Sequence, residues 1–181
     1  MASRTLRQVL TIAGSDSGGG AGIQADIKSM SANGVFAMSV ITAVTAQNTE
    51  DVTDVFELPT SIIASQLDAV FDDFDVAAVK TGMLSSTAVV ELVAKMLAIQ
   101  KVANLVVDPV MISKSGHALL TPDAIDALKK LLFPLALVVT PNIHEAQQLS
   151  GLAIANLADA RRAAKIIHGF GPKYVLIKGV H

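Results

Sequence analysis

Residues 9–26 read VLTIAGSDSGGGAGIQAD, and this stretch decides how the rest of the chain is interpreted. An apolar run typical of a buried strand comes first, and a helix-like segment follows the glycines. The nine residues from Gly14 to Gly22 hold five of the twelve glycines in the chain. Glycine is costly to order, so such a cluster indicates positive φ angles or a backbone that approaches a ligand closely. Because open α/β sheets bind ligands where strands pass into helices, the stretch predicts a site here.

The composition is that of one folded domain without disulfides. The 181 residues are 51% apolar and 17% charged, which suits a sizeable core and excludes a disordered chain. A formal net charge of −2 offers no basic surface, so we expect no nucleic acid partner. The lack of cysteine excludes thiolate metal sites and a cysteine nucleophile within these residues. No apolar run approaches the roughly 20 residues that a membrane span needs, so we expect a cytoplasmic protein.

Strand-like and helix-like segments alternate along the chain. The expected strands are residues 9–13, 37–44, 52–58, 77–81, 105–108, 137–140 and 174–178. The expected helices are residues 23–33, 61–71, 87–100, 123–133, 143–149 and 157–168. This alternation predicts an α/β fold with a mainly parallel central sheet and helices on both faces. The strand at 52–58 follows its predecessor too closely for a helical crossover, so we expect an antiparallel pair or an edge extension there.

The glycine-rich loop supports several interpretations. A Walker A loop is excluded, because no Gly-Lys followed by Ser or Thr occurs. The run from Gly20 to Ala25 fits a dinucleotide-binding fingerprint, but residues 28–49 hold no acidic side chain for a ribose. A loop that closes over a small polar substrate, with Asp16 and Asp26 at its ends, fits better. The remaining interpretation is a merely flexible connection.

Four polar side chains lie at the ends of expected strands, where parallel sheets bind their ligands. Asp108 either serves at this edge or starts a turn before Pro109. Lys80 and Lys178 each reach either a phosphate, as a point charge, or solvent. The amide of Gln47 offers a donor and an acceptor, which suits the edge of a heterocycle, although loop glutamines are often only solvated.

Asn142 and Glu145 follow the expected strand at 137–140, and they support two compatible interpretations. An Asn at the N-cap with Glu three residues later resembles a capping box, which satisfies two free backbone N–H groups. The same spacing also suits a site for Mg²⁺-bound water near a nucleotide phosphate, because Mg²⁺ prefers oxygen ligands and retains waters.

Together and in this order, the segments resemble the hydroxymethylpyrimidine/phosphomethylpyrimidine kinases of thiamine biosynthesis, which are ribokinase-like kinases. The resemblance spans nearly the whole chain and implies a ribokinase-like α/β fold. It rests on LTIAGSDSGGGAGIQAD at 10–26, TAQNT at 45–49, KTGML at 80–84, VDPVM at 107–111, KSG at 114–116, LFPLA at 132–136, TPN at 140–142 with Glu145, and LIKG at 176–179.

The resemblance implies a substrate site and a role for each residue in it. Gln47 would hydrogen-bond the aminopyrimidine, and Met83 would pack on its ring. Asp26 would bind the polar edge or the hydroxymethyl side of the substrate. Gly14 and Ala21 would line the same site.

The resemblance also implies a phosphoryl-transfer site. Asp108, Asn142 and Glu145 would organise Mg²⁺ and phosphate, and Lys178 would lie near the nucleotide. The family transfers the γ-phosphoryl group of ATP to a hydroxymethyl group and then to the resulting monophosphate. A homodimer is expected by the same resemblance.

Family members, by resemblance, carry a Gly-Thr-Gly-Cys-like segment whose backbone N–H groups face the transferring phosphate. These residues contain no such segment, so we expect the catalytic residues to lie beyond His181. We expect residues 1–181 to be a single ribokinase-like kinase domain that lacks its C-terminal nucleotide-binding and anion-hole part and is inactive alone. Two alternatives stay open: a pyridoxine/pyridoxal kinase of the same superfamily, and a non-catalytic pyrimidine-binding module.

Overall fold

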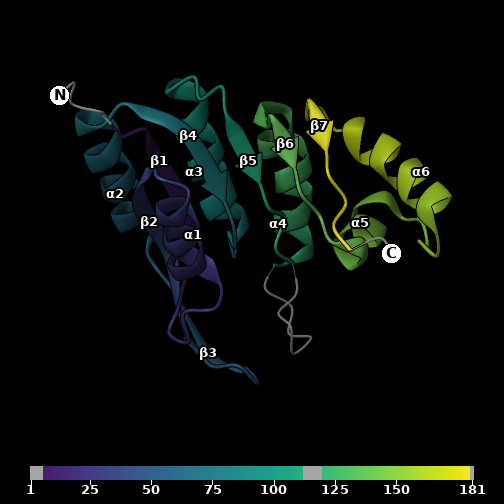
Figure 1. The fold of residues 1–181 in the computed structure, drawn as a ribbon, viewed down its shortest axis with the longest axis horizontal. Helices are drawn as coiled ribbons and strands as arrows, with labels where there is room; N and C mark the ends of the chain where they lie inside the picture. The colour runs from purple at the N-terminus through teal and green to yellow at the C-terminus, as the bar shows by residue number, and fades with distance from the viewer. Residues whose placement is uncertain (1–5, 112–119, 180–181) are drawn as a thin grey trace.

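The computed structural model describes residues 6–111 and 120–179, so the KSG motif at 114–116 lies outside the described residues. The described strands form a seven-stranded sheet with the order β3-β2-β1-β4-β5-β6-β7 (Figure 1). The strands are β1 (Gln8–Asp16), β2 (Phe36–Gln47), β3 (Val52–Glu57), β4 (Val76–Thr81), β5 (Leu105–Val107), β6 (Val138–Val139) and β7 (Tyr174–Val175). The helices are α1 (Gly22–Ala32), α2 (Thr60–Asp73), α3 (Thr87–Ile99), α4 (Pro122–Ala127), η1 (Leu128–Leu132), η2 (Phe133–Leu135), α5 (Ile143–Ser150) and α6 (Leu157–His168).

The mainly parallel α/β sheet expected from the sequence is confirmed. Every pair of neighbouring strands is parallel except β2 and β3, which pair antiparallel at the edge of the sheet. The antiparallel edge expected at residues 52–58 is therefore confirmed as well. In Figure 1, α1 lies over β1 and β2, whereas α3 and α4 lie behind the sheet.

The core explains why the central strands read as apolar runs. Leu10 and Ile12 of β1, Val40 of β2 and Leu105 of β5 have no exposed surface. Strands that are covered on both faces need apolar side chains in both directions. Since the parallel strands run the same way, their carboxyl ends meet at one edge of the sheet, and the polar residues that follow them gather there.

The helix expected at residues 123–133 is not continuous. It begins as expected, with Thr121 at the N-cap accepting a hydrogen bond from the N–H of Ala124, and α4 ends at Ala127. A π-helical turn, η1, and a 3-10 turn, η2, replace the rest. Pro134 lacks an N–H and its ring would clash with the carbonyl four residues earlier, so a regular α-helix cannot continue through it.

Two expected strands are also shorter than the sequence indicated. The ladder keeps only two residues each in β6 and β7, although backbone hydrogen bonds from the N–H of Thr140 to the Val107 carbonyl and from the N–H of Leu176 to the Val139 carbonyl continue beyond them. A single parallel bridge between Asn142 and Lys178 continues the pairing beyond the strands. Within residues 6–111 and 120–179, no helix combines the length and the apolar character that crossing a membrane requires.

Candidate functional site

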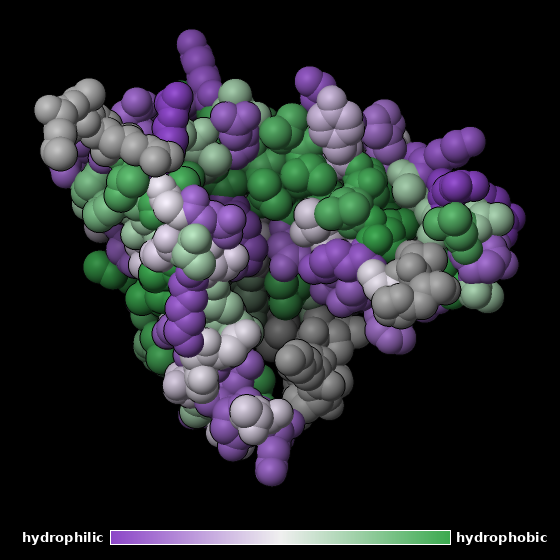
Figure 2. All heavy atoms as spheres, in the orientation of Figure 1, coloured by the Kyte–Doolittle hydropathy of each residue, from purple (hydrophilic) through white to green (hydrophobic). Residues whose placement is uncertain are grey.

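A cavity of about 450 Å³ opens at the carboxyl edge of the sheet. All five residues expected to bind the substrate line it, and Asp108 does so as well; the five are Gly14, Ala21, Asp26, Gln47 and Met83. Figure 2 shows the face of Figure 1 hollowed between the part built on α1 and the part built on α5, with hydrophilic side chains beside the hollow. Lys178, Asn142 and Glu145 are not in the cavity wall, but Lys178 contacts Asp108.

The glycine-rich loop is closed by the carboxylate of Asp16, whose exposed fraction is only 4%. Its oxygens accept hydrogen bonds from the N–H groups of Gly18, Gly20 and Ala21 at 2.8, 2.9 and 2.7 Å. The loop is therefore ordered rather than a flexible connection. Because both oxygens of the Asp16 carboxylate accept these bonds, this side chain shapes the loop at the cavity wall.

We expect Asp16→Asn to lower the free energy of unfolding by about 1–3 kcal/mol, because a neutral amide replaces the charged acceptor of three backbone N–H groups and its NH2 end cannot accept from them. Urea denaturation measures this change. The control is Asp68→Asn on the exposed surface of α2, which should leave the unfolding curve unchanged. An equal effect of both substitutions would contradict the assigned role of Asp16.

Gly22 explains how the loop turns into α1. Its φ of +56° is a left-handed conformation, and a Cβ at this position would collide with the carbonyl oxygen of Gly14. Only glycine accommodates both the angle and the close approach. The glycine-rich sequence is thus needed to fold the loop back over the end of β1.

Gln47 lies at one end of the cavity, where β2 ends. Ser17 links it to the glycine-rich loop: its hydroxyl donates to the carbonyl of Gln47 at 2.7 Å and accepts from its N–H at 2.8 Å. The side-chain Oε1 accepts from the hydroxyl of Thr45 at 3.2 Å. Among the described residues, the Nε2 amide group of Gln47 has no hydrogen-bond partner, so it is available to a ligand.

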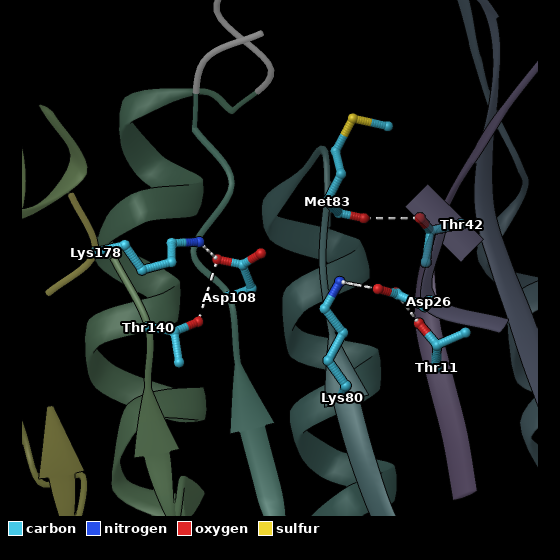
Figure 3. Close-up of polar contacts among 8 residues, drawn as sticks. All are labelled: Thr11, Asp26, Thr42, Lys80, Met83, Asp108, Thr140 and Lys178. Atoms are coloured by element: carbon cyan, nitrogen blue, oxygen red, sulfur yellow. Dashed lines mark hydrogen bonds and ion pairs between the residues drawn. The ribbon is translucent and has the colours of Figure 1, made fainter. Parts of the chain in front are cut away.

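Met83 provides an apolar wall of the cavity. Its backbone carbonyl accepts a hydrogen bond from the buried hydroxyl of Thr42 at 2.8 Å, which fixes the segment after β4 (Figure 3). A Cβ on Gly14 would lie 2.6 Å from the Cε of Met83. Gly14 therefore leaves the space that the methionine side chain occupies, and the two residues are coupled by packing.

Asp26 and Lys80 form an ion pair in the cavity wall. The ammonium of Lys80 donates to both carboxylate oxygens of Asp26, at 2.8 and 3.1 Å, and Thr11 donates its hydroxyl to Oδ2 at 2.6 Å (Figure 3). The two charged side chains are about one-fifth exposed, at 20% and 18%. A Cβ on Gly82 would lie 3.0 Å from the Lys80 Nζ, so glycine leaves room for the ammonium at this position.

Asp108 forms a second ion pair at the end of β5. Its Oδ1 accepts from the Nζ of Lys178 at 2.8 Å and from the hydroxyl of Thr140 at 3.3 Å (Figure 3). Among the described residues, its Oδ2 has no partner. Asp108 thus offers one oxygen to a ligand at the cavity wall, while Lys178 sets its orientation.

Asn142 and Glu145 form the expected capping box at the start of α5. The N–H of Asn142 donates to Glu145 Oε2 at 2.7 Å, and the N–H of Glu145 donates to Asn142 Oδ1 at 2.9 Å. Burial raises the pKa of the Glu145 carboxyl above its ordinary value of 4.5. The hydrogen bond from Asn142 opposes this rise, the negative charge of Asp108 adds to it, and the positive charge of Lys178 lowers the pKa.

The residues expected to hold a metal are therefore brought into one neighbourhood. Glu145 is close enough to Asp108 and Lys178 for their charges to act on its pKa. Within residues 6–111 and 120–179, no group of three or more acidic, histidine or cysteine side chains is arranged to hold a metal ion. The site offers two carboxylates and an amide, which is a set of oxygen donors.

Sequence reasoning missed several polar residues of the site. The sequence gives no functional signal for Thr11 or Thr140, and for Lys80 it indicates contact with phosphate or solvent rather than with Asp26. Threonine in a strand is common because its branched side chain suits the pleated surface, so its presence carries no functional signal. Only the fold brings each hydroxyl next to a carboxylate.

The chain is similar to proteins of one family over almost its entire length. The family model described as phosphomethylpyrimidine kinase matches residues 16–181. The chain is 52% identical over 176 residues to the hydroxymethylpyrimidine/phosphomethylpyrimidine kinase of Haemophilus influenzae. That match covers 97% of this chain and 65% of the relative, so the chain spans slightly less than two thirds of the relative's length.

Two solved structures share the fold. The crystal structure of phosphomethylpyrimidine kinase from Clostridium difficile superposes with a TM-score of 0.90 at 52% identity, covering 97% of this chain and 76% of that one. An ADP complex of pyridoxal kinase from Bacillus subtilis superposes with a TM-score of 0.87 at 42% identity, covering 95% and 66%. The ribokinase-like fold implied by the sequence motifs agrees with both structures.

Proposed function

Because the chain belongs to the phosphomethylpyrimidine kinase family, we propose that the whole protein transfers the γ-phosphoryl group of ATP to hydroxymethylpyrimidine and then to its monophosphate. The product would serve thiamine biosynthesis. One observation carries the proposal: Gln47, Asp26 and Met83, which come from three separate segments, line a single cavity. A cavity with an amide, a carboxylate and an apolar wall suits a small heteroaromatic alcohol.

The arrangement along the sheet edge supports separate roles for the residues that would bind the substrate and those that would contact the nucleotide. Gln47 at the end of β2 would hydrogen-bond the ring, and Met83 would pack against it. Asp108 and Lys178 lie on the other side of β4, at the ends of β5 and β7, and would face the phosphates of the nucleotide. Holding acceptor and donor in one cavity favours transfer, because phosphoryl transfer depends mainly on positioning and charge stabilisation.

Mg²⁺ fits the residues present. Asp108 has an oxygen without a partner among the described residues, and the buried Glu145 carboxyl has a raised pKa that a nearby cation would lower again. We propose that Asp108 binds Mg²⁺ and that Asn142 and Glu145 hold it through water. When bound, the ion would neutralise charge on the phosphates.

The function test is direct. Purified whole protein incubated with ATP and Mg²⁺ should phosphorylate hydroxymethylpyrimidine and its monophosphate, as followed by phosphorus NMR. Binding of the pyrimidine without any phosphorylation would favour the alternative of a non-catalytic binding module. We further propose that the protein is a cytoplasmic homodimer. Sedimentation of the whole protein tests the dimer, and fractionation of cells tests the location.

Pyridoxal phosphorylation is the second candidate, favoured by the fold shared with the Bacillus subtilis pyridoxal kinase. Pyridoxal and hydroxymethylpyrimidine are both heteroaromatic compounds with a hydroxymethyl group. A higher kcat/KM for pyridoxal than for hydroxymethylpyrimidine in the same assay would select this candidate.

We expect Gln47→Ala to weaken hydroxymethylpyrimidine binding by about 1–3 kcal/mol, because a polar group of the bound ring loses its partner. Titration calorimetry measures the change, and circular dichroism should show an intact fold. The control is Gln100→Ala, which removes an exposed glutamine at the end of α3. Unchanged affinity of the Gln47 variant would refute the proposed contact.

A further inference from the structure

The cavity wall has a marked imbalance of charge. Among the described residues that line it, five are acidic and one, Lys80, is basic. The acidic ones are Asp16, Asp26, Glu50, Asp51 and Asp108. Lys178 pairs with Asp108 and backbone N–H groups bond to Asp16, so part of this charge is compensated. A phosphate brought next to carboxylates still costs free energy that a neutral alcohol does not, since like charges repel. A monophosphate therefore needs Lys80 more than an alcohol does.

Lys80 retains a hydrogen-bond donor after its pairing with Asp26. An ammonium has three N–H groups, and the described partners of Lys80 are the two oxygens of Asp26. Asp26 retains an acceptor in turn: Oδ2 accepts from Thr11 and Lys80, whereas Oδ1 accepts from Lys80 alone. The pair thus presents one donor and one acceptor side by side to the cavity.

The position of the pair indicates which part of a ligand it meets. β1 and β4 lie between β2, which ends at Gln47, and β5, which leads to Asp108. Asp26 packs on β1 through Thr11, and Lys80 belongs to β4. The pair therefore lies between the end of the cavity that would hold the ring and the end that would face the nucleotide. In a substrate bound this way, the hydroxymethyl oxygen occupies that intermediate position.

We propose that Lys80 binds the group that receives the phosphoryl and distinguishes the two substrates of the proposed function, on which this inference rests. Its free N–H donates to the hydroxymethyl oxygen of the alcohol, whose proton is donated to Asp26 Oδ1. In the monophosphate the same N–H donates to a phosphate oxygen. The hydroxyl proton is then absent, so Asp26 contributes no bond and Lys80 supplies the attraction.

The proposal predicts that replacing Lys80 weakens binding of the monophosphate more than binding of the alcohol. In Lys80→Met the alcohol keeps its bond to Asp26, whereas the monophosphate loses its cation and faces an unshielded carboxylate. We expect monophosphate affinity to fall about 10- to 100-fold, the size of a charged hydrogen bond, and alcohol affinity to fall several-fold less. Calorimetric titration of the whole protein with each compound, without nucleotide, measures both.

Two further variants keep the result interpretable. Lys80→Met combined with Asp26→Asn removes both charges, so that no unpaired carboxylate destabilises the fold, and it should still bind the monophosphate poorly. Lys95→Met on the exposed face of α3 makes the same change in net charge and should bind both compounds normally. The melting temperature of each variant shows whether it is folded.

The outcomes separate this inference from the proposed function. Equal losses for the two compounds in Lys80→Met, or a double variant that binds the monophosphate normally, would overturn the role of Lys80 and leave the kinase proposal intact. Binding of neither compound by the unsubstituted protein would overturn the proposed substrates and this inference with them.

Discussion

Asp108→Asn is expected to lower turnover about 100- to 1,000-fold, the range seen when one preorganised electrostatic group is removed from an active site. The carboxylate of Asp108 holds Lys178 through Oδ1 and presents Oδ2 to the cavity. An asparagine is neutral, so it holds neither Lys178 nor a cation with the same strength. Steady-state kinetics of the whole protein with ATP and hydroxymethylpyrimidine measures the loss.

Stability should change little in the same variant. The Lys178 and Asp108 side chains are 45% and 22% exposed, and ion pairs this accessible contribute only about 0–1 kcal/mol. The matched control is Asp159→Asn, which removes an aspartate paired with Arg162 on α6, outside the cavity. Turnover that falls equally in both variants, or a large drop in the melting temperature of Asp108→Asn, would contradict a role in transfer.

The order of elements was predictable because local signals agree with the fold. The apolar run before Gly14 becomes the doubly covered strand β1, and the glycines become the turn into α1. Asp108 and Gln47 follow strands, and parallel strands bring their carboxyl ends to one edge. Residue type and position therefore indicate the carboxyl edge of the sheet as a site, whereas the roles expected for Gln47, Asp26 and Met83 come from the family resemblance.

The pairing of side chains was not predictable, because it depends on the order of strands in space. Lys80 and Asp26 are 54 residues apart in sequence, and Lys178 and Asp108 are 70 apart. Each lysine becomes an ion-pair partner only because β4 lies beside β1, and β6 and β7 lie beyond β5. The sequence indicates a cation at a strand end but not the carboxylate that it contacts.

Asp16 shows a further limit of prediction from the sequence. At the end of an apolar strand and beside glycines, it has the sequence context of a ligand-binding carboxylate. The loop instead folds so that three backbone N–H groups reach the carboxylate. Such an arrangement requires the left-handed φ angles of Gly19 and Gly22, which the sequence permits but does not dictate.

Glu145→Gln is expected to separate the proposed metal role of this residue from its capping role. A glutamine at the same position of a capping box still accepts the hydrogen bond from the N–H of Asn142. It cannot carry the negative charge that would hold Mg²⁺-bound water. We expect turnover to fall about 10- to 100-fold, as for other outer partners of metal sites, and the Mg²⁺ concentration for half-maximal activity to rise. The control is Glu91→Gln on the exposed surface of α3, which should alter neither.

The same variant should change how stability depends on pH. The folded-state pKa of Glu145 is raised above 4.5, so the folded protein binds this proton more tightly than the unfolded chain does. The resulting stabilisation is present below pH 4.5 and is lost as the pH rises through the raised pKa. Relative to Glu145→Gln, whose amide does not titrate, the unsubstituted protein should lose free energy of unfolding across this interval. At neutral pH without Mg²⁺, the variant should be at least as stable as the unsubstituted protein.

Chemical denaturation at a series of pH values measures this difference in stability. Parallel curves for the two proteins would show that burial of Glu145 does not oppose its ionisation. Added Mg²⁺ should then stabilise the unsubstituted protein more than the variant. Attraction between the cation and the ionised carboxylate offsets the free-energy cost of burying that charge, and the uncharged amide has no such attraction.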